Sequence, residues 1–183
     1  QKKYPEIPFM GEESFYATHK SGNGNAYKKF EKLPWCWVVD PLDGTTNFLS
    51  GLFYYAVCIA LVKDGKPVLG LVYAPEMQET FFAIKDGGAF YRARGDKQAK
   101  KMLPVTLSKT SLKQALLVTG FNSEKGEMYT PEFYTLKKIM ENARGVRRMG
   151  SAALDLCYVA RGIFDGFWEI GLAPWDVAAS VMI

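Results

Sequence analysis

The sequence has 183 residues, of which 48% are hydrophobic and 14% aromatic. A chain of this length and composition can bury a sizeable core, which excludes disorder and favours one large domain or two small ones. It carries 23 Lys and Arg against 19 Asp and Glu, a net charge of +4. No stretch approaches the roughly 20 apolar residues that span a bilayer, so we expect no contact with a membrane.

Three cysteines and one histidine limit the possible chemistry. Cys36, Cys58 and Cys157 are odd in number and stand among apolar neighbours, which predicts buried thiols in a reducing compartment and not a disulfide framework. His19 alone leaves almost no material for Ser-His-Asp catalysis or for a histidine-rich zinc site. We therefore expect a cytoplasmic enzyme that works with carboxylates.

The two ends suggest that sequence is missing on either side. Residues 175–183 begin a helical pattern without a terminal glycine or asparagine cap. The residues before Gly11 show no helix or strand of their own. We expect the chain to be a piece of a longer protein, or to lack its outer parts.

The first part of the chain predicts an antiparallel sheet. Residues 16–34 are polar and rich in glycine, which predicts an exposed loop, and the apolar run 35–39 predicts a buried strand ending at Asp40. Strands that follow one another through short turns favour antiparallel pairing. The further predicted strands are 56–63, 67–73, 79–84 and 89–91.

The second part alternates strand and helix. Between the two parts, residues 92–113 hold seven basic residues and one acidic residue. They predict a solvated connection, because nucleic-acid contact would require interleaved aromatic side chains. The later predicted elements are a strand at 115–119, a helix that begins at Thr130-Pro131 with apolar positions 133, 136, 140 and 143 on one face, a helix at 151–161 and a strand at 165–171. We expect two unlike subdomains, residues 1–105 and 106–183.

The segment 40–47, Asp-Pro-Leu-Asp-Gly-Thr-Thr-Asn, is the most informative part of the sequence. A buried strand delivers Asp40 to a sheet edge, Pro41 fixes the backbone after it, and Asp43 follows in a tight turn. Two such carboxylates repel by about 4 kcal/mol at about 4 Å in an effective dielectric of about 20, so we expect a cation between them. Oxygen ligands favour Mg²⁺, Mn²⁺ or Ca²⁺ over zinc.

Other interpretations of this segment can be compared by spacing. A plain turn is the simplest. A calcium loop of the EF-hand type needs Asp or Asn, Gly and Glu where Leu42, Thr45 and Gly51 stand. A haloacid-dehalogenase-type phosphatase needs an aspartate nucleophile where Pro41 stands. The N–H groups after Gly44 would favour an anion beside the cations, an arrangement suited to phosphoryl transfer to water.

The chain resembles the inositol monophosphatase family, and most closely its bacterial branch. Three motifs in the family's order carry the resemblance: Gly11-Glu12-Glu13-Ser14, the segment 40–47, and Trp175–Ala179. The segments 148–156 and 167–171 extend it over essentially all 183 residues. The resemblance implies a mixed α/β fold, the layered α-β-α-β-α sandwich of the sugar phosphatases, here incomplete at both ends. It also implies a homodimer.

The resemblance further implies a metal site and a substrate site. The implied metal ligands are Glu12, Asp40, the carbonyl of Leu42, Asp43 and Asp176. The implied catalytic residues are Thr45, which would orient or deprotonate the attacking water, Asp43 and Glu12, and the amides of Gly44 and Thr45 would hold the phosphate. The implied substrate contacts are Leu42, Asp43, Gly44, Thr45, Gly150, Ser151, Ala152, Glu169 and Asp176.

Some of these residues also suit ordinary structural roles. Ser151 and Asp176 are good N-caps for the helices that follow them. Arg147 and Arg148 fit an exposed surface or an interface.

The implied activity is hydrolysis of inositol monophosphate, or of a similar polyol or sugar phosphate, by direct attack of water. Two or three Mg²⁺ per site are implied as cofactors, with Mn²⁺ as a substitute. Glu169 fits a hydroxyl-rich ligand because a carboxylate accepts hydrogen bonds from vicinal hydroxyls. Fructose 1,6-bisphosphate and 3′-phosphoadenosine phosphates are alternative substrates. A catalytically weak binding protein is an alternative of a different class, although such a protein would be expected to lose one of its acids.

Overall fold

The computed structural model describes residues 4–12, 15, 30, 32–105, 111–121 and 129–183. Most of the predicted loop at 16–34, including His19, lies outside these ranges, as do Glu13 and part of the connection at 92–113. None of the helices in the described ranges combines the length and the apolar character that a membrane crossing requires.

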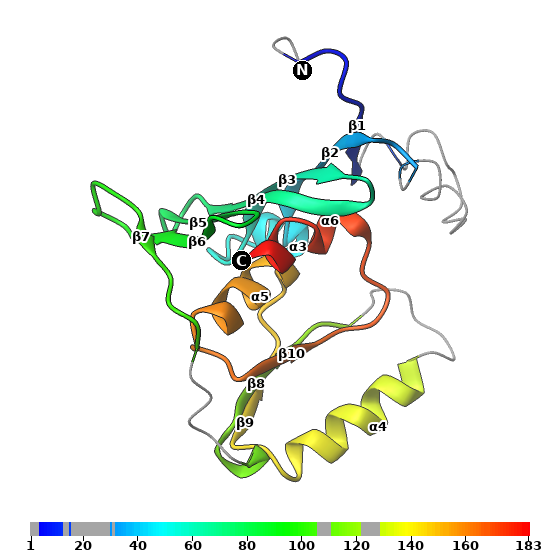
Figure 1. The fold of residues 1–183 in the computed structure, drawn as a ribbon. Coiled ribbons are helices and arrows are strands. Elements are labelled where there is room, and N and C mark those ends of the chain that lie inside the picture. Colours follow the sequence, from blue (N-terminus) through cyan, green and yellow to red (C-terminus); the bar gives the residue numbers. More distant parts are fainter. Residues whose placement is uncertain (1–3, 13–14, 16–29, 31, 106–110, 122–128) are drawn as a thin grey trace.

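A seven-stranded mixed sheet forms the upper layer of the molecule in Figure 1. Its strands lie in the order of the sequence, with β1 parallel to β2 and every later pair antiparallel, as expected for the hairpins. The strands are β1 (Phe9–Gly11), β2 (Trp35–Asp43), β3 (Ala56–Lys63), β4 (Lys66–Ala74), β5 (Glu79–Ile84), β6 (Gly88–Arg92) and β7 (Lys100–Lys101). The expectation of no strand before Gly11 was wrong, because three residues are too few to show a periodic pattern.

A β-bulge lengthens β2 beyond the predicted end at Asp40. Asp40 lies opposite Cys58 and Asp43 opposite Ala56, so three steps along β2 match two steps along β3. Pro41, which has no N–H to donate, stands within this irregularity. Residues three apart on a regular strand face opposite sides of a sheet, and the extra residue removes that opposition. Asp40 and Asp43 are accordingly both buried.

A second sheet of three parallel strands has β8 at its centre. It consists of β8 (Leu116–Thr119), β9 (Gly145–Arg147) and β10 (Gly166–Trp168), with the short 3₁₀ helix η1 (Leu112–Gln114) before β8. The sequence pattern missed β9, and β10 is shorter than the predicted strand at 165–171.

Two helices accompany the second sheet, α4 (Tyr129–Met140) and α5 (Ala152–Ala160). Pro131 is the third residue of α4 and not the first helical residue. The predicted apolar face of α4 was wrong in part, since Phe133 and Met140 are exposed and Glu132 is buried.

The described elements stack as sheet, helices, sheet and helix (Figure 1). Beneath the large sheet lie α5 and α6 (Pro174–Val177), then the small sheet, then α4. Leu154 and Cys157 of α5 join Val72 and Phe81 of the large sheet in one buried core. Each such large apolar side chain contributes about 1.5–3 kcal/mol when buried, so this contact fixes α5 against the sheet.

The end of the chain returns to the large sheet. The helical pattern at 175–183 becomes two short pieces, α6 and the 3₁₀ helix η2 (Ser180–Met182). A Cβ at Gly70 of β4 would lie 2.1 Å from the carbonyl oxygen of Ala179, so only glycine permits this approach. The division at residue 105 stays a prediction, although the change from one sheet to the other falls near it.

Candidate active site

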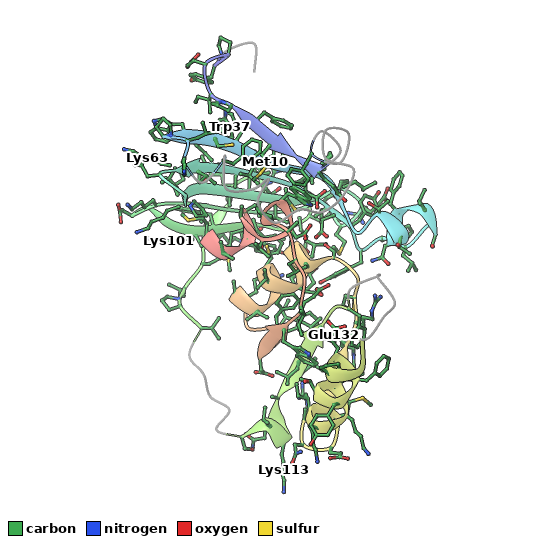
Figure 2. All side chains as sticks on the ribbon, turned by 90° about the vertical axis from the view of Figure 1, so that its right-hand side faces the viewer. Met10, Trp37, Lys63, Lys101, Lys113 and Glu132 are labelled. Atoms are coloured by element: carbon green, nitrogen blue, oxygen red, sulfur yellow. The ribbon has the colours of Figure 1, made fainter. Side chains whose placement is uncertain are left out.

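Most of the predicted site residues line a cleft of about 370 Å³ beside the turn after β2. It is lined from the large sheet and α3 (Thr45–Leu49) on one side, and from α5, the segment after β10 and α6 on the other. The predicted residues that line it are Glu12, Asp43, Gly44, Thr45, Gly150, Ala152, Glu169 and Asp176. Lys63 and Lys101 lie at the opposite end of the large sheet from α3 (Figure 2), so they do not balance the charge of the cleft.

The turn between β2 and α3 is held by short-range hydrogen bonds. Gly44 adopts φ +90°, a left-handed conformation that favours glycine, and α3 begins at the next residue. The hydroxyl of Thr45 donates to the carbonyl of Leu42 at 2.9 Å. The amide of Leu42 donates to Asp40 Oδ1, also at 2.9 Å. Because α3 has only five residues its dipole is small, and the first N–H groups of the turn are the feature suited to an anion.

Asp43 links the large sheet to the start of α5. Its Oδ2 accepts hydrogen bonds from Ser151 Oγ at 2.5 Å and from the amide of Ala153 at 2.9 Å. Ser151 also N-caps α5 by accepting from the amide of Leu154, so the predicted capping role is confirmed. Ser151 is only 1% exposed and does not line the cleft. Its side chain contacts Asp43, and its predicted contact with the substrate stays a prediction.

Asp176 caps its helix in an unexpected way. It is the third residue of α6, and its Oδ2 accepts from the amide of Ala173 at 2.6 Å. Ala173 is therefore the N-cap, and the prediction of Asp176 as N-cap was wrong. The reach back to Ala173 still leaves Asp176 lining the cleft.

Burial and mutual repulsion raise the pKa values of the acids around the cleft. Burial, followed by the charges of Asp43, Glu12 and Asp176, raises the pKa of Asp40 to about 8, against the lowering effect of the Leu42 amide. Burial is also the main cause that raises the pKa of Asp176 to about 6. Negative charge on these groups is costly in the absence of a cation.

Asn47, Asp155 and Arg148 are among the cleft residues that were not predicted as site residues. Asp155 accepts from the Tyr54 hydroxyl at 2.8 Å, and burial raises the pKa of Asp155 to about 8. A carboxylate within the otherwise apolar run of α5 was a signal that could have revealed it. Arg148 is the one basic side chain among the described cleft residues and lies 5.5 Å from the centre of the Phe121 ring.

The carboxylate of Glu169 also lines the cleft. A Cβ at Gly120 would lie 2.1 Å from Glu169 Oε2, so the carboxylate rests directly on the end of β8. Burial first, and then the charges of Asp176 and Asp43, raise the pKa of Glu169 to about 7. Near neutral pH this group can both donate and accept hydrogen bonds.

The predicted metal ligands are not assembled into a finished cage. Asp40 is 1% exposed, and neither Asp40 nor Leu42 lines the cleft. The described residues include no group of three or more His, Cys, Asp or Glu side chains placed to hold a metal ion as they stand. The donor chemistry nevertheless fits a divalent cation that prefers oxygen, because burial and the nearby charges of Asp43, Glu12 and Asp176 raise the pKa of Asp40. The ligand set stays a prediction.

Comparison with known proteins shows which family the chain resembles. The profile of the inositol monophosphatase family matches residues 1–183. The chain is 38% identical to an inositol-1-monophosphatase of Rhizobium meliloti and 36% identical to the Nus factor SuhB of Pasteurella multocida. Both alignments cover 100% of the chain, which spans 61% of the length of each relative.

A solved structure agrees with these relatives. The inositol monophosphatase from Anabaena (Nostoc) sp. PCC 7120 superimposes with a TM-score of 0.80 at 34% identity, over 99% of this chain and 64% of the other. The fold matches that expected from the sequence motifs. The chain belongs to the inositol monophosphatase family.

Proposed function

We propose that the protein is a Mg²⁺-dependent phosphomonoesterase that hydrolyses inositol monophosphate, or a similar polyol or sugar phosphate, by direct attack of water. The observation that carries this proposal is the meeting of the Gly44–Thr45 turn with the carboxylates of Glu12, Asp43 and Asp176 at one cleft. Anion-binding amides next to cation-binding carboxylates are what a phosphate ester and its metal ions require.

Each residue at the turn has a role in this proposal. Glu12, Asp40, Asp43, Asp176 and the Leu42 carbonyl would hold the cations. A bound cation would lower the pKa of a water molecule that it binds and would neutralise charge on the phosphate. The hydroxyl of Thr45 donates to Leu42, so its oxygen remains able to accept a hydrogen bond and orient the attacking water. The amides of Gly44 and Thr45 would hold the phosphate oxygens.

The opposite wall fits the alcohol part of the substrate. Glu169, Gly150 and Ala152 line the cleft and would contact its hydroxyl groups. A relative named inositol-1-monophosphatase supports inositol as that alcohol. Fructose 1,6-bisphosphate and 3′-phosphoadenosine phosphates remain alternatives, because the same turn would hold their phosphate.

A substrate panel with and without Mg²⁺ tests the proposal. Inositol 1-phosphate, fructose 1,6-bisphosphate and 3′-phosphoadenosine phosphate should be compared by phosphate release, with chelator and Mn²⁺ as further arms. We expect Mg²⁺-dependent turnover that is highest for inositol 1-phosphate. Asn142→Ala is a suitable control, because the exposed side chain of Asn142 donates to the carbonyl of Lys138 and does not line the cleft. Turnover that survives chelation would contradict the proposal.

A regulatory binding role is the second candidate. The observation that favours it is the name Nus factor SuhB, carried by a relative 36% identical to the chain. The test compares wild type with Asp43→Asn, which should lose hydrolysis. A cellular function that persists in Asp43→Asn would show that binding, and not hydrolysis, is the role under selection.

The cellular setting also belongs to this proposal. Cys36, Cys58 and Cys157 are free and buried, as predicted, which supports a reducing compartment and therefore the cytoplasm. We further propose a homodimer, to be tested by light scattering of the purified protein.

A further inference from the structure

We infer that Asn47 is a positioning residue that holds the segment 149–152 against the phosphate-binding turn and thereby sets where the alcohol part of the substrate binds. This inference rests on the proposed function. Asn47 lies on α3, is 8% exposed, and lines the cleft.

The side-chain amide of Asn47 joins three parts of the chain. Its Nδ2 donates to the carbonyl of Tyr54 at 2.7 Å and to the carbonyl of Met149 at 2.8 Å. A carboxamide nitrogen carries two hydrogens, so these two acceptors use both of them. Tyr54 leads into β3, whereas Met149 lies between β9 and α5. One buried side chain therefore connects the large sheet to the segment before α5.

The backbone at Gly44 and Gly150 is packed so closely beside this amide that a side chain at either position would be too near its neighbours. Gly150 has φ +89°, and a Cβ built on it would lie 3.0 Å from Asn47 Nδ2. A Cβ at Gly44 would lie 3.1 Å from the carbonyl oxygen of Gly150. The phosphate-binding turn and the Gly150 segment thus meet backbone to backbone, and the Asn47 amide holds that contact.

The segment that Asn47 holds carries proposed substrate contacts. Gly150 and Ala152 line the cleft, and Ala152 begins α5. Asp43–Ser151 is a second link to the same segment, but it ends on a predicted metal ligand. Asn47 is uncharged and ends on main-chain carbonyls. Its loss should therefore weaken recognition of the alcohol more than the hydrolysis of the phosphate.

The activity test compares two substrates in three variants. The leaving group of inositol 1-phosphate carries several further hydroxyl groups, whereas the leaving group of p-nitrophenyl phosphate carries no further hydroxyl group. In Asn47→Ala we expect KM for inositol 1-phosphate to rise about tenfold, as the loss of one well-made buried hydrogen-bond pair allows, with KM for p-nitrophenyl phosphate changed less than about twofold. Asn47→Asp should raise KM for inositol 1-phosphate further, because a carboxylate oxygen would face a carbonyl oxygen. Asn142→Ala, which loses an exposed amide bond to Lys138, should match wild type.

A readout independent of activity separates this inference from the proposed function. Amide hydrogen exchange at 149–153 should be faster in Asn47→Ala than in wild type, with the strands of the large sheet unchanged. Equal losses for both substrates, or unaltered exchange at 149–153, would overturn the positioning role. If wild type hydrolyses neither substrate, the proposed function fails and exchange alone decides the role of Asn47. If Asn47→Ala does not fold, Asn47→Gln, which keeps both donors on a longer stem, should show a smaller shift of the same kind.

Discussion

Ser151 Oγ lies 2.5 Å from Asp43 Oδ2 and donates a hydrogen bond to it, across 108 residues of sequence. The same hydroxyl oxygen accepts from the amide of Leu154 and so caps α5. One serine therefore orients a predicted metal ligand and begins the helix behind it. Ser151 and Ala153 both donate to Oδ2 of Asp43, and the amide of Ala152 also donates to this carboxylate. We expect Oδ1, which accepts neither of the two bonds to Oδ2, to be the oxygen that faces a cation.

Ser151→Ala should weaken both the fold and the metal site. Loss of the cap and of the bond to Asp43 should lower the free energy of unfolding by about 1–2 kcal/mol. Mg²⁺ should also bind more weakly, because Asp43 loses the group that orients it. Urea unfolding and isothermal titration calorimetry measure these two effects. Ser180→Ala is the matched control, since Ser180 is also buried but bonds to Val177. Equal Mg²⁺ affinity in both variants would contradict the orienting role.

Asp43→Asn should abolish hydrolysis and keep the fold. The amide oxygen of Asn can still accept from Ser151 and Ala153, so the link to α5 survives in neutral form. The amide nitrogen then replaces Oδ1, and a nitrogen that carries two hydrogens cannot bind a cation. Circular dichroism and turnover at saturating Mg²⁺ check the two halves of this prediction. Near-normal turnover would mean that Asp43 is not a metal ligand.

Stability without metal should fall as the pH rises. The pKa values of Asp40 and Asp155 rise to about 8 and that of Glu169 to about 7, all above those of unfolded chains. The folded state therefore holds these protons more tightly. The contribution of these bound protons to the free energy of unfolding is complete below about pH 4, and it is lost as the pH rises through about 8. Unfolding in urea at about pH 6 and about pH 8.5, in the presence of chelator, measures this loss.

Mg²⁺ should reverse that trend, because it binds ionised carboxylates and only the folded state brings them together. The gain in melting temperature on adding Mg²⁺ should accordingly be larger at the higher pH. Asp155→Asn provides an internal comparison. It removes one titrating group, keeps an acceptor for the Tyr54 hydroxyl, and should flatten the pH dependence. A metal-free protein equally stable at both pH values would refute the proposed cause.

The sequence pattern predicted the hairpins and the grouping of acids better than it predicted short elements. Strands β3 and β5 end where the periodic apolar runs end. Burial of one face of the sheet determines both the apolar pattern in the sequence and the extent of the strand. Strands β1 and β9 have three residues each and owe their existence to pairing with β2 and β8. Pairing partners distant in sequence leave no local signal.

The orientation of site residues was also beyond local pattern. The turn at 40–47 indicated that Asp40 and Asp43 converge, but not that a bulge brings both of them inward. The motif predicted a substrate contact at Ser151, but it did not indicate that the Ser151 hydroxyl donates to Asp43. Asn47 is the last residue of the motif at 40–47. Its inferred positioning role depends on a hydrogen bond to Met149, 102 residues away, which the motif does not indicate.

Hydrolysis should invert the configuration at phosphorus. The described cleft residues include no histidine, cysteine or lysine, and Pro41 occupies the position of a covalent aspartate nucleophile. The Thr45 hydroxyl donates to a carbonyl and not to a base, so it lacks the activation that a nucleophilic hydroxyl needs. Water must then displace the alcohol in one in-line step. A substrate with a chirally labelled phosphate should yield inverted product, whereas a phosphorylated enzyme would require two displacements and give net retention. Retention, or phosphoaspartate at Asp40 or Asp43 trapped by rapid acid quench, would show that these carboxylates attack phosphorus themselves.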